Sequence, residues 1–133
     1  MSKMSLVAHL LLDDFGYHLR QIFGDCAYHV GTSVLTDAWN DVDVRLIVSD
    51  DEYASYGDPE NPHWNGKWVS TCLALSHFGR VLTGLPIDFQ IQQQSYANEH
   101  FSQKDGCIRS ALGINRQIRE QATPPTTTEG EQT

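Results

Sequence analysis

The sequence predicts an α+β (α/β) fold in which a small mixed sheet packs on helices. Two stretches, 5–23 and 67–83, repeat apolar residues at three- and four-residue spacing, which is typical of amphipathic helices. Three shorter stretches, 26–30, 41–48 and 87–92, are strand candidates, and the last two alternate polar and apolar residues. The predicted order along the chain is therefore helix, strand, strand, helix, strand, followed by further helical material.

The boundaries of these elements follow from the residues between them. Gly24 directly after the first helical stretch, and Gly84 with Pro86 after the second, are typical of helix ends. We expect a turn or short helix over 33–40. Residues 49–66 are rich in Asp, Gly, Pro and Asn, which predicts a long loop.

The C-terminal part carries weaker patterns. We expect a helix over 95–103 and a weaker one over 108–121. Residues 122–133 are rich in Pro, Thr and Glu and nearly free of large apolar side chains, which predicts a disordered tail. At 133 residues the chain fits a single domain, which we expect to cover residues 1–121.

Composition indicates a cytoplasmic protein. The three cysteines, Cys26, Cys72 and Cys107, are widely spaced and form no metal-binding pair, so reduced thiols are the simplest interpretation. The longest apolar run near the start, 10–12, is too short for a spanning helix or a signal peptide. The sequence therefore predicts no contact with a membrane.

Negative charge is concentrated in one segment. Residues 37–60 hold eight acidic side chains against Arg45 alone, a net charge of −7 in a chain whose total is −8. This excess argues against unassisted binding along a nucleic-acid backbone and is compatible with divalent cations. An acidic solvated loop explains most of residues 49–60, but it does not explain Asp41 and Asp43, which alternate with valines.

Three aspartates are expected on one polar face of the sheet. Asp41 and Asp43 share a face of the strand 41–48, and Asp88 lies on the polar face of the strand 87–92. Like charges repel, and Arg45 on the same face would offset part of that repulsion. Carboxylate oxygens favour Mg²⁺ or Mn²⁺, and ligands at positions i and i+2 can bridge two ions. The plain alternative for Asp88 is a carboxylate facing solvent.

A glycine turn precedes these carboxylates. Gly31 lets backbone approach a ligand, and Thr32 and Ser33 add hydroxyl and N–H groups suited to the phosphates of a nucleoside triphosphate (NTP). A plain turn or a helix cap is the alternative for Thr32 and Ser33. The bases available for a triphosphate are few: Arg45, Lys67, Arg80 and Arg109.

The glycine turn, the Asp-x-Asp pair and the later strand carboxylate together resemble the nucleotidyltransferase domain of the DNA polymerase β superfamily. The likeness covers about residues 5–92 and extends to small nucleotidyltransferase-like proteins of bacteria and phages. It implies that fold's minimal helix–strand–strand–helix–strand core. The residues that it implies for catalysis and for two Mg²⁺ or Mn²⁺ ions are Asp41, Asp43 and Asp88, and those for phosphate are Gly31, Thr32 and Ser33. Thr32 stands where the family usually has serine.

The resemblance implies an enzyme that transfers a nucleoside monophosphate (NMP) from an NTP to a hydroxyl and releases pyrophosphate. The acceptor stays open among a small molecule, a protein side chain and an RNA end. A second hypothesis is a catalytically weak module that binds nucleotide, metal or a protein partner, paired as a homodimer or with a substrate-recognising chain. A third is a metal-dependent phosphohydrolase or nuclease, since three carboxylates also suit water as the nucleophile.

Overall fold

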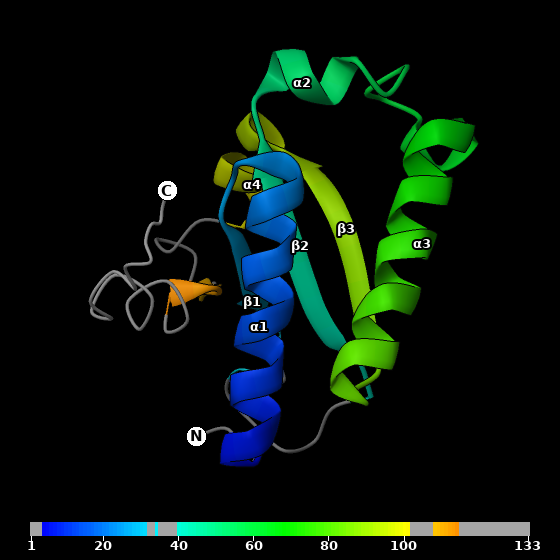
Figure 1. Cartoon of the computed structure of the whole chain (residues 1–133). Coiled ribbons are helices and arrows are strands. Elements are labelled where there is room, and N and C mark those ends of the chain that lie inside the picture. Colours follow the sequence, from blue (N-terminus) through cyan, green and yellow to red (C-terminus); the bar gives the residue numbers. More distant parts are fainter. Residues whose placement is uncertain (1–3, 32–33, 35–39, 102–107, 115–133) are drawn as a thin grey trace, which may run out of the picture.

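The computed structural model describes residues 4–31, 34, 40–101 and 108–114, and within them it shows helices packed on a small mixed sheet. The larger elements are α1 (Leu6–Phe23), β1 (Ala27–Val30), β2 (Val42–Val48), α3 (Gly66–Thr83) and β3 (Ile87–Gln93). The smaller ones are α2 (Asp50–Ala54), the 3₁₀ helix η2 (Pro62–Trp64), α4 (Gln94–His100) and β4 (Ser110–Ala111). The predicted α+β class and the order of the five larger elements are confirmed (Figure 1).

The sheet has the strand order β3-β2-β1-β4. β1 pairs with β2 and with β4 in antiparallel orientation, whereas β2 and β3 run parallel. The parallel pair is connected through α3, as parallel neighbours require a crossover. This crossover brings the starts of β2 and β3 side by side.

One face of the sheet is covered by helices, and we call the opposite face, whose β2 and β3 side chains are partly exposed among the described residues, the open face. α1 and α3 lie on the same side of the sheet (Figure 1). In β2 and β3 every second side chain is buried beneath these helices, and the fully buried ones include Val42, Val44, Ile87 and Phe89. The alternate side chains of both strands remain partly exposed on the opposite face, where the polar residues lie.

The covered face is centred on Phe15 of α1, which is fully buried. Its ring contacts Phe78 of α3 and Phe89 of β3, with centroids 6.0 and 6.4 Å away. A Cβ built on Gly79 would come within 2.8 Å of the Phe15 ring, so the ring packs directly against the backbone of α3. Phe15 thus joins both helices to the strand that carries Asp88.

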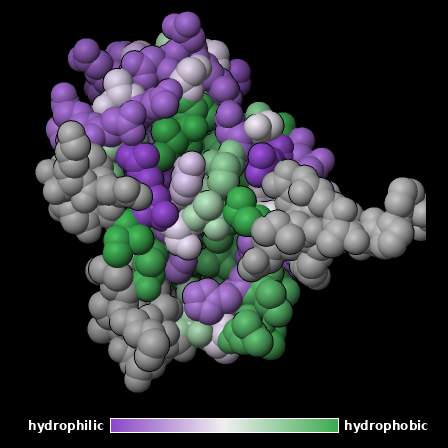
Figure 2. Space-filling model, turned by 90° about the vertical axis from the view of Figure 1, so that its left-hand side faces the viewer, coloured by the Kyte–Doolittle hydropathy of each residue, from purple (hydrophilic) through white to green (hydrophobic). Residues whose placement is uncertain are grey.

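The long loop expected over residues 49–66 is wrong in part, because α2 and η2 form within it. The Ser49 side chain accepts a hydrogen bond from the Glu52 N–H at 3.1 Å and caps α2. Three acidic residues occupy the first turn of α2, where the helix dipole favours negative charge. Figure 2 shows hydrophilic side chains over the upper end of the molecule, where α2 lies in Figure 1.

The helix expected over residues 108–121 is wrong over 108–113, although Ile114 is helical. Ser110 and Ala111 pair with β1 as an edge strand. The Leu112 N–H donates to the Ala27 carbonyl at 2.9 Å, and the Gly113 N–H donates to Asp13 Oδ1 at 2.9 Å. Pairing with a distant strand outweighs the weak local helical pattern here. Residues 115–121 and the predicted tail over 122–133 lie outside the described residues.

The other boundaries agree closely with the expectations. Gly24 and Gly84 end α1 and α3, and α4 begins at Gln94 within one residue of the predicted start. After β1, the Val34 N–H donates to the Gly31 carbonyl at 3.3 Å. Most of 33–40 lies outside the described residues. Among the helices of the described residues, none has the length and apolar character needed to cross a membrane.

Acidification is expected to destabilise the fold through His29, which lies on the covered face and is 3% exposed. Burial, with a smaller contribution from His9, lowers the pKa of His29 to about 4. Unfolded histidine titrates near 6.5, so the unfolded chain binds the extra proton first as the pH falls. This difference should lower the free energy of unfolding by about 3 kcal/mol between pH 7 and pH 4.

Urea unfolding at pH 7, 5.5 and 4 measures this effect. The variant His29→Gln should lose most of that pH dependence, whatever its stability at pH 7. The same slope in the variant as in the wild type would show that another group causes it. His18→Gln, on the partly exposed part of α1, is the matched control.

Candidate functional site

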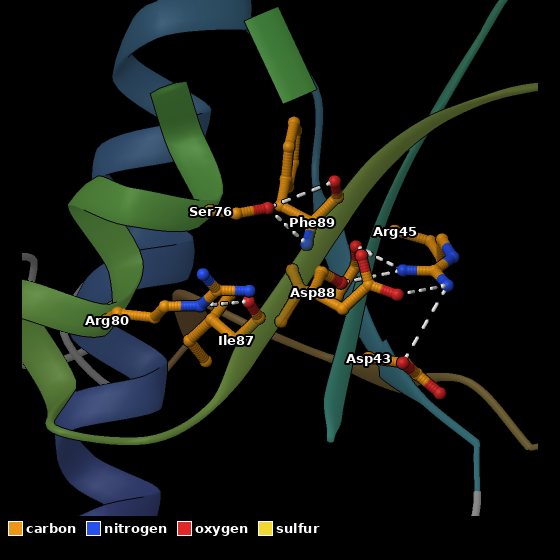
Figure 3. A network of polar contacts seen from close by, with 8 residues as sticks. Asp43, Arg45, Ser76, Arg80, Ile87, Asp88 and Phe89 are labelled. Carbon is orange, nitrogen blue, oxygen red and sulfur yellow. Dashed lines mark hydrogen bonds and ion pairs between the residues drawn. The ribbon is translucent and has the colours of Figure 1, made fainter. Parts of the chain in front are cut away.

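The candidate site lies on the open face, at the start of the two parallel strands. Asp43 of β2 and Asp88 of β3 are direct register partners, so their side chains project from the same face at neighbouring positions. These side chains are 30% and 37% exposed, which leaves both open to a ligand. The structure therefore brings two of the three predicted carboxylates together (Figure 3).

Arg45 lies beside this carboxylate pair. Its Nη1 donates to the Asp88 carbonyl at 2.7 Å and to the Val44 carbonyl at 3.1 Å, which anchors the guanidinium to backbone. Its Nη2 lies 3.4 Å from Asp88 Oδ2 and 3.8 Å from Asp43 Oδ1. These two distances exceed the roughly 2.7–2.9 Å of a strong charge-assisted hydrogen bond. Arg45 thus offsets the repulsion of the aspartates while leaving carboxylate oxygens available to a further cation.

Asp43 carries its negative charge in an unfavourable environment. Partial burial raises the pKa of Asp43 above that of an ordinary aspartate, and the neighbouring Asp88 and Asp41 carboxylates raise it further. Arg45 opposes this change. All three predicted carboxylates are therefore close enough to interact electrostatically at Asp43. A bound cation would favour the ionised form of Asp43.

Asp41 is the outermost of the three. It is exposed and lies immediately before the first residue of β2. Within the described ranges, no three His, Cys, Asp or Glu side chains are already arranged as a group that could hold a metal ion. Of the three carboxylates predicted to bind metal, Asp43 and Asp88 are thus the two that the structure pairs directly. Oxygen donors with excess negative charge fit a hard cation such as Mg²⁺.

Gly31 lies against the Asp43 carboxylate. Its backbone has φ = +82°, a conformation that favours glycine. A Cβ at this position would come within 2.5 Å of Asp43 Oδ2, so the carboxylate occupies the space that any other side chain would need. Thr32 and Ser33 lie outside the described residues, and their contact with phosphate stays a prediction.

Gly31→Ala is expected to disturb the site more than the fold. The added methyl group would displace the Asp43 carboxylate, and the left-handed backbone would be strained. We expect the free energy of unfolding to fall by about 1–2 kcal/mol. The stabilisation by Mg²⁺ and NTP should fall by a larger fraction than the free energy of unfolding. Thermal unfolding with and without Mg²⁺ and NTP measures both. Gly24→Ala is the control, because Gly24 has φ = +80° but no atom near a built Cβ.

Most of the other candidate bases have roles elsewhere. Arg80 Nε donates to the Ile87 carbonyl at 2.9 Å, and Arg109 donates to the Ala97 and Phe101 carbonyls at 3.0 and 3.3 Å. Lys67 Nζ lies over the Tyr56 ring, 5.0 Å from its centroid. Of the four candidate bases, Arg45 is therefore the one that contacts the carboxylates.

Ser76 supports the site and was not identified from the sequence. Its Oγ accepts from the Phe89 N–H at 2.9 Å and lies 3.3 Å from the Phe89 carbonyl oxygen, to which it donates. These bonds give hydrogen-bond partners to the backbone of β3 on its edge away from β2, next to Asp88. Arg80 binds the same edge through the Ile87 carbonyl (Figure 3). A serine among the apolar residues of a helix was the available signal, but its partner depends on tertiary packing.

Comparison of the chain with protein-family models, with curated proteins and with solved structures finds no match. The functional assignment therefore depends on the chemistry and geometry of this site.

Proposed function

We propose that the chain is a metal-dependent nucleotidyltransferase that transfers NMP from an NTP to a hydroxyl and releases pyrophosphate. The observation that supports this function best is the in-register pair of Asp43 and Asp88 on the open face, with Gly31 backbone against the Asp43 carboxylate. We further propose that α1, β1, β2, α3 and β3 form the minimal nucleotidyltransferase core that the sequence resembles.

Each residue has a defined role in the proposed reaction. When bound, Mg²⁺ or Mn²⁺ would polarise the phosphates and lower the pKa of the attacking hydroxyl. Asp43 and Asp41 would hold cations, and Asp88 would hold one and accept the proton of the hydroxyl. Gly31 lets the backbone approach the phosphates closely, because glycine has no side chain. Arg45 keeps Asp88 oriented through its bonds to the backbone and carboxylate.

Two measurements test the proposal. Thermal unfolding with each NTP, with and without Mg²⁺, should show stabilisation that requires both; a ligand at a hundred times its dissociation constant adds about 2.7 kcal/mol. Incubation of NTP labelled at the α-phosphate with cell lysate should then give a labelled adduct and pyrophosphate. Labelled free NMP without an adduct would instead indicate hydrolysis, and no Mg²⁺-dependent stabilisation by any NTP would contradict the proposal.

A catalytically weak binding module is the second candidate, and one observation favours it. The Arg45 guanidinium lies beside both carboxylates, and its positive charge offsets part of their negative charge without a metal ion. Stabilisation by NTP and Mg²⁺ without any labelled product would support this module. A protein partner or a second copy of the chain stays a prediction of the sequence under either candidate.

A further inference from the structure

A cavity of about 550 Å³ lies along the later residues of β3, next to Arg45. Its lining includes Arg45 and three residues of β3 with amide side chains, Gln90, Gln92 and Gln93, and it reaches the core residues Trp68 and Ile91. Its walls include aromatic rings from α2 and α4, Tyr53 and Tyr96. A cavity of this volume, with rings and a few polar groups, has the size and lining of a site for a small molecule.

The cavity shares Arg45 with the candidate site. Arg45 lines the cavity and also lies within 3.4 Å of the Asp88 carboxylate. Gln90 is the register partner of Arg45 and follows Asp88 by two positions on the same face of β3. A molecule in the cavity therefore contacts Arg45 and Gln90, the two lining residues nearest to Asp88, the carboxylate proposed to accept a proton.

The cavity and the glycine turn lie on opposite sides of the carboxylates. Gly31 follows the end of β1 and contacts Asp43 near the start of β2, since these strands are antiparallel. The cavity instead extends along the later residues of β3, toward α2 and α4. In phosphoryl transfer the attacking and leaving oxygens are roughly in line, so the nucleophile approaches opposite the departing pyrophosphate. With the phosphates near Gly31, the cavity is on the nucleophile's side.

The lining of the cavity indicates the chemistry of its ligand. Amides both donate and accept hydrogen bonds, and aromatic rings stack on flat groups. Among the described residues that line the cavity, the side chains with a formal charge are Arg45 and Glu60, one of each sign. This balance suits an uncharged molecule better than a nucleic-acid end, whose phosphates would face an acidic region.

We propose that this cavity binds the acceptor of the NMP group, and that the acceptor is an uncharged, hydroxylated compound carrying a flat ring. The inference rests on the proposed function. In the reaction, the acceptor oxygen forms a bond to the α-phosphorus and its proton moves to the Asp88 carboxylate. The bond between the α-phosphorus and its bridging oxygen breaks, and pyrophosphate leaves with that electron pair.

Calorimetric titration and transfer assays with two uncharged probes test this inference. The probes are p-nitrophenyl β-glucoside and adenosine, which join a flat ring to a sugar from different compound classes. At least one should bind the wild type and receive the labelled NMP, and the one that does identifies the class. Gln90→Leu should weaken its binding about tenfold, since one hydrogen-bonding group of the cavity lining is lost, and should leave stabilisation by NTP and Mg²⁺ unchanged.

Gln94→Leu is the matched control, because Gln94 is exposed and adjoins the cavity strand without lining it. It should leave probe binding unchanged. Stabilisation by NTP with no binding of either probe would overturn the acceptor site but leave the proposed function intact. Loss of NTP stabilisation in Gln90→Leu would show that the cavity holds the nucleotide instead. Labelling of an RNA 3′ end in place of both probes would also overturn the inference. Absence of NTP stabilisation in the wild type would contradict the proposed function itself.

Discussion

Asp43→Asn should abolish nucleotidyl transfer and at the same time stabilise the folded chain. The amide is nearly the same size but carries no charge, so it is a poorer ligand for Mg²⁺ and weakens the proposed metal site. We expect a loss of turnover of about 10³-fold or more, with no further loss in the double variant with Asp88→Asn, because groups that act as a unit are not additive. Label transfer from NTP measures this loss.

The gain in stability follows from the raised pKa of Asp43, which burial causes first and the neighbouring carboxylates increase. A raised folded-state pKa means that the folded chain binds the proton more tightly than the unfolded chain. The aspartate therefore lowers stability as the pH rises from the ordinary aspartate pKa through the raised one. The asparagine side chain of the variant is neutral at every pH, so the variant should be more stable than the wild type at pH 7.

Urea unfolding of wild type and variant at pH 4 and pH 7, without metal, measures this gain, which should be smaller at pH 4. Asp51→Asn, an exposed aspartate in α2, is the control and should leave transfer unchanged. A variant that turns over at the wild-type rate would remove Asp43 from the mechanism. A variant less stable than wild type at pH 7 would show that the Arg45 contact outweighs the cost of burial.

Phe15→Ala should produce the largest loss of stability. Phe15 is fully buried, and its ring fills the space between α1, α3 and β3. Removal of a buried phenylalanine ring costs about 3–5 kcal/mol, because transfer energy is lost and a cavity remains. Domains are stable by only about 5–15 kcal/mol, so the variant should unfold at much lower urea concentration.

Two further variants on α1 test whether the loss of stability in Phe15→Ala comes from lost packing. Phe15→Leu keeps part of the apolar volume and should show an intermediate loss. Val7→Ala removes a side chain that is 65% exposed and should change stability by less than about 0.5 kcal/mol. Equal effects of Phe15→Ala and Val7→Ala would contradict the central position of the ring. Because Phe89 contacts Phe15 and adjoins Asp88, partial unfolding here should also weaken Mg²⁺-dependent binding of NTP.

The two aspartates of the candidate site could be predicted from the sequence, but the contacts that hold Arg45 beside them could not. The period-two alternation around Asp43 and Asp88 placed both on one face of their strands, and the structure pairs them. The backbone bonds that hold Arg45 beside them could not be predicted, because the carbonyl of Asp88 is distant in sequence. The same holds for Ser76 and for the cavity beside Gln90, which several separate elements build together.

The fold was predictable wherever one short segment carries a strong periodic pattern. The helices α1 and α3 and the strands β2 and β3 each bury one face, and burial of apolar area imposes that period on the sequence. The expectations for 49–66 and 108–121 were wrong where the deciding interaction was a single cap or a distant pairing. Ser49 starts α2 with one hydrogen bond, and β4 exists because β1 offers it an edge.

The sequence by itself determined the class of fold, the identity of the two strand carboxylates and the glycine that precedes them. These features depend on local periodicity and on residue chemistry, which are written along the chain. Only the tertiary structure decided that Asp43 meets Asp88 in register, that Arg45 lies beside them and that a cavity opens next to Arg45. Those features depend on the crossover through α3, because the parallel pairing of two strands forty-five residues apart is a property of packing and not of any one segment.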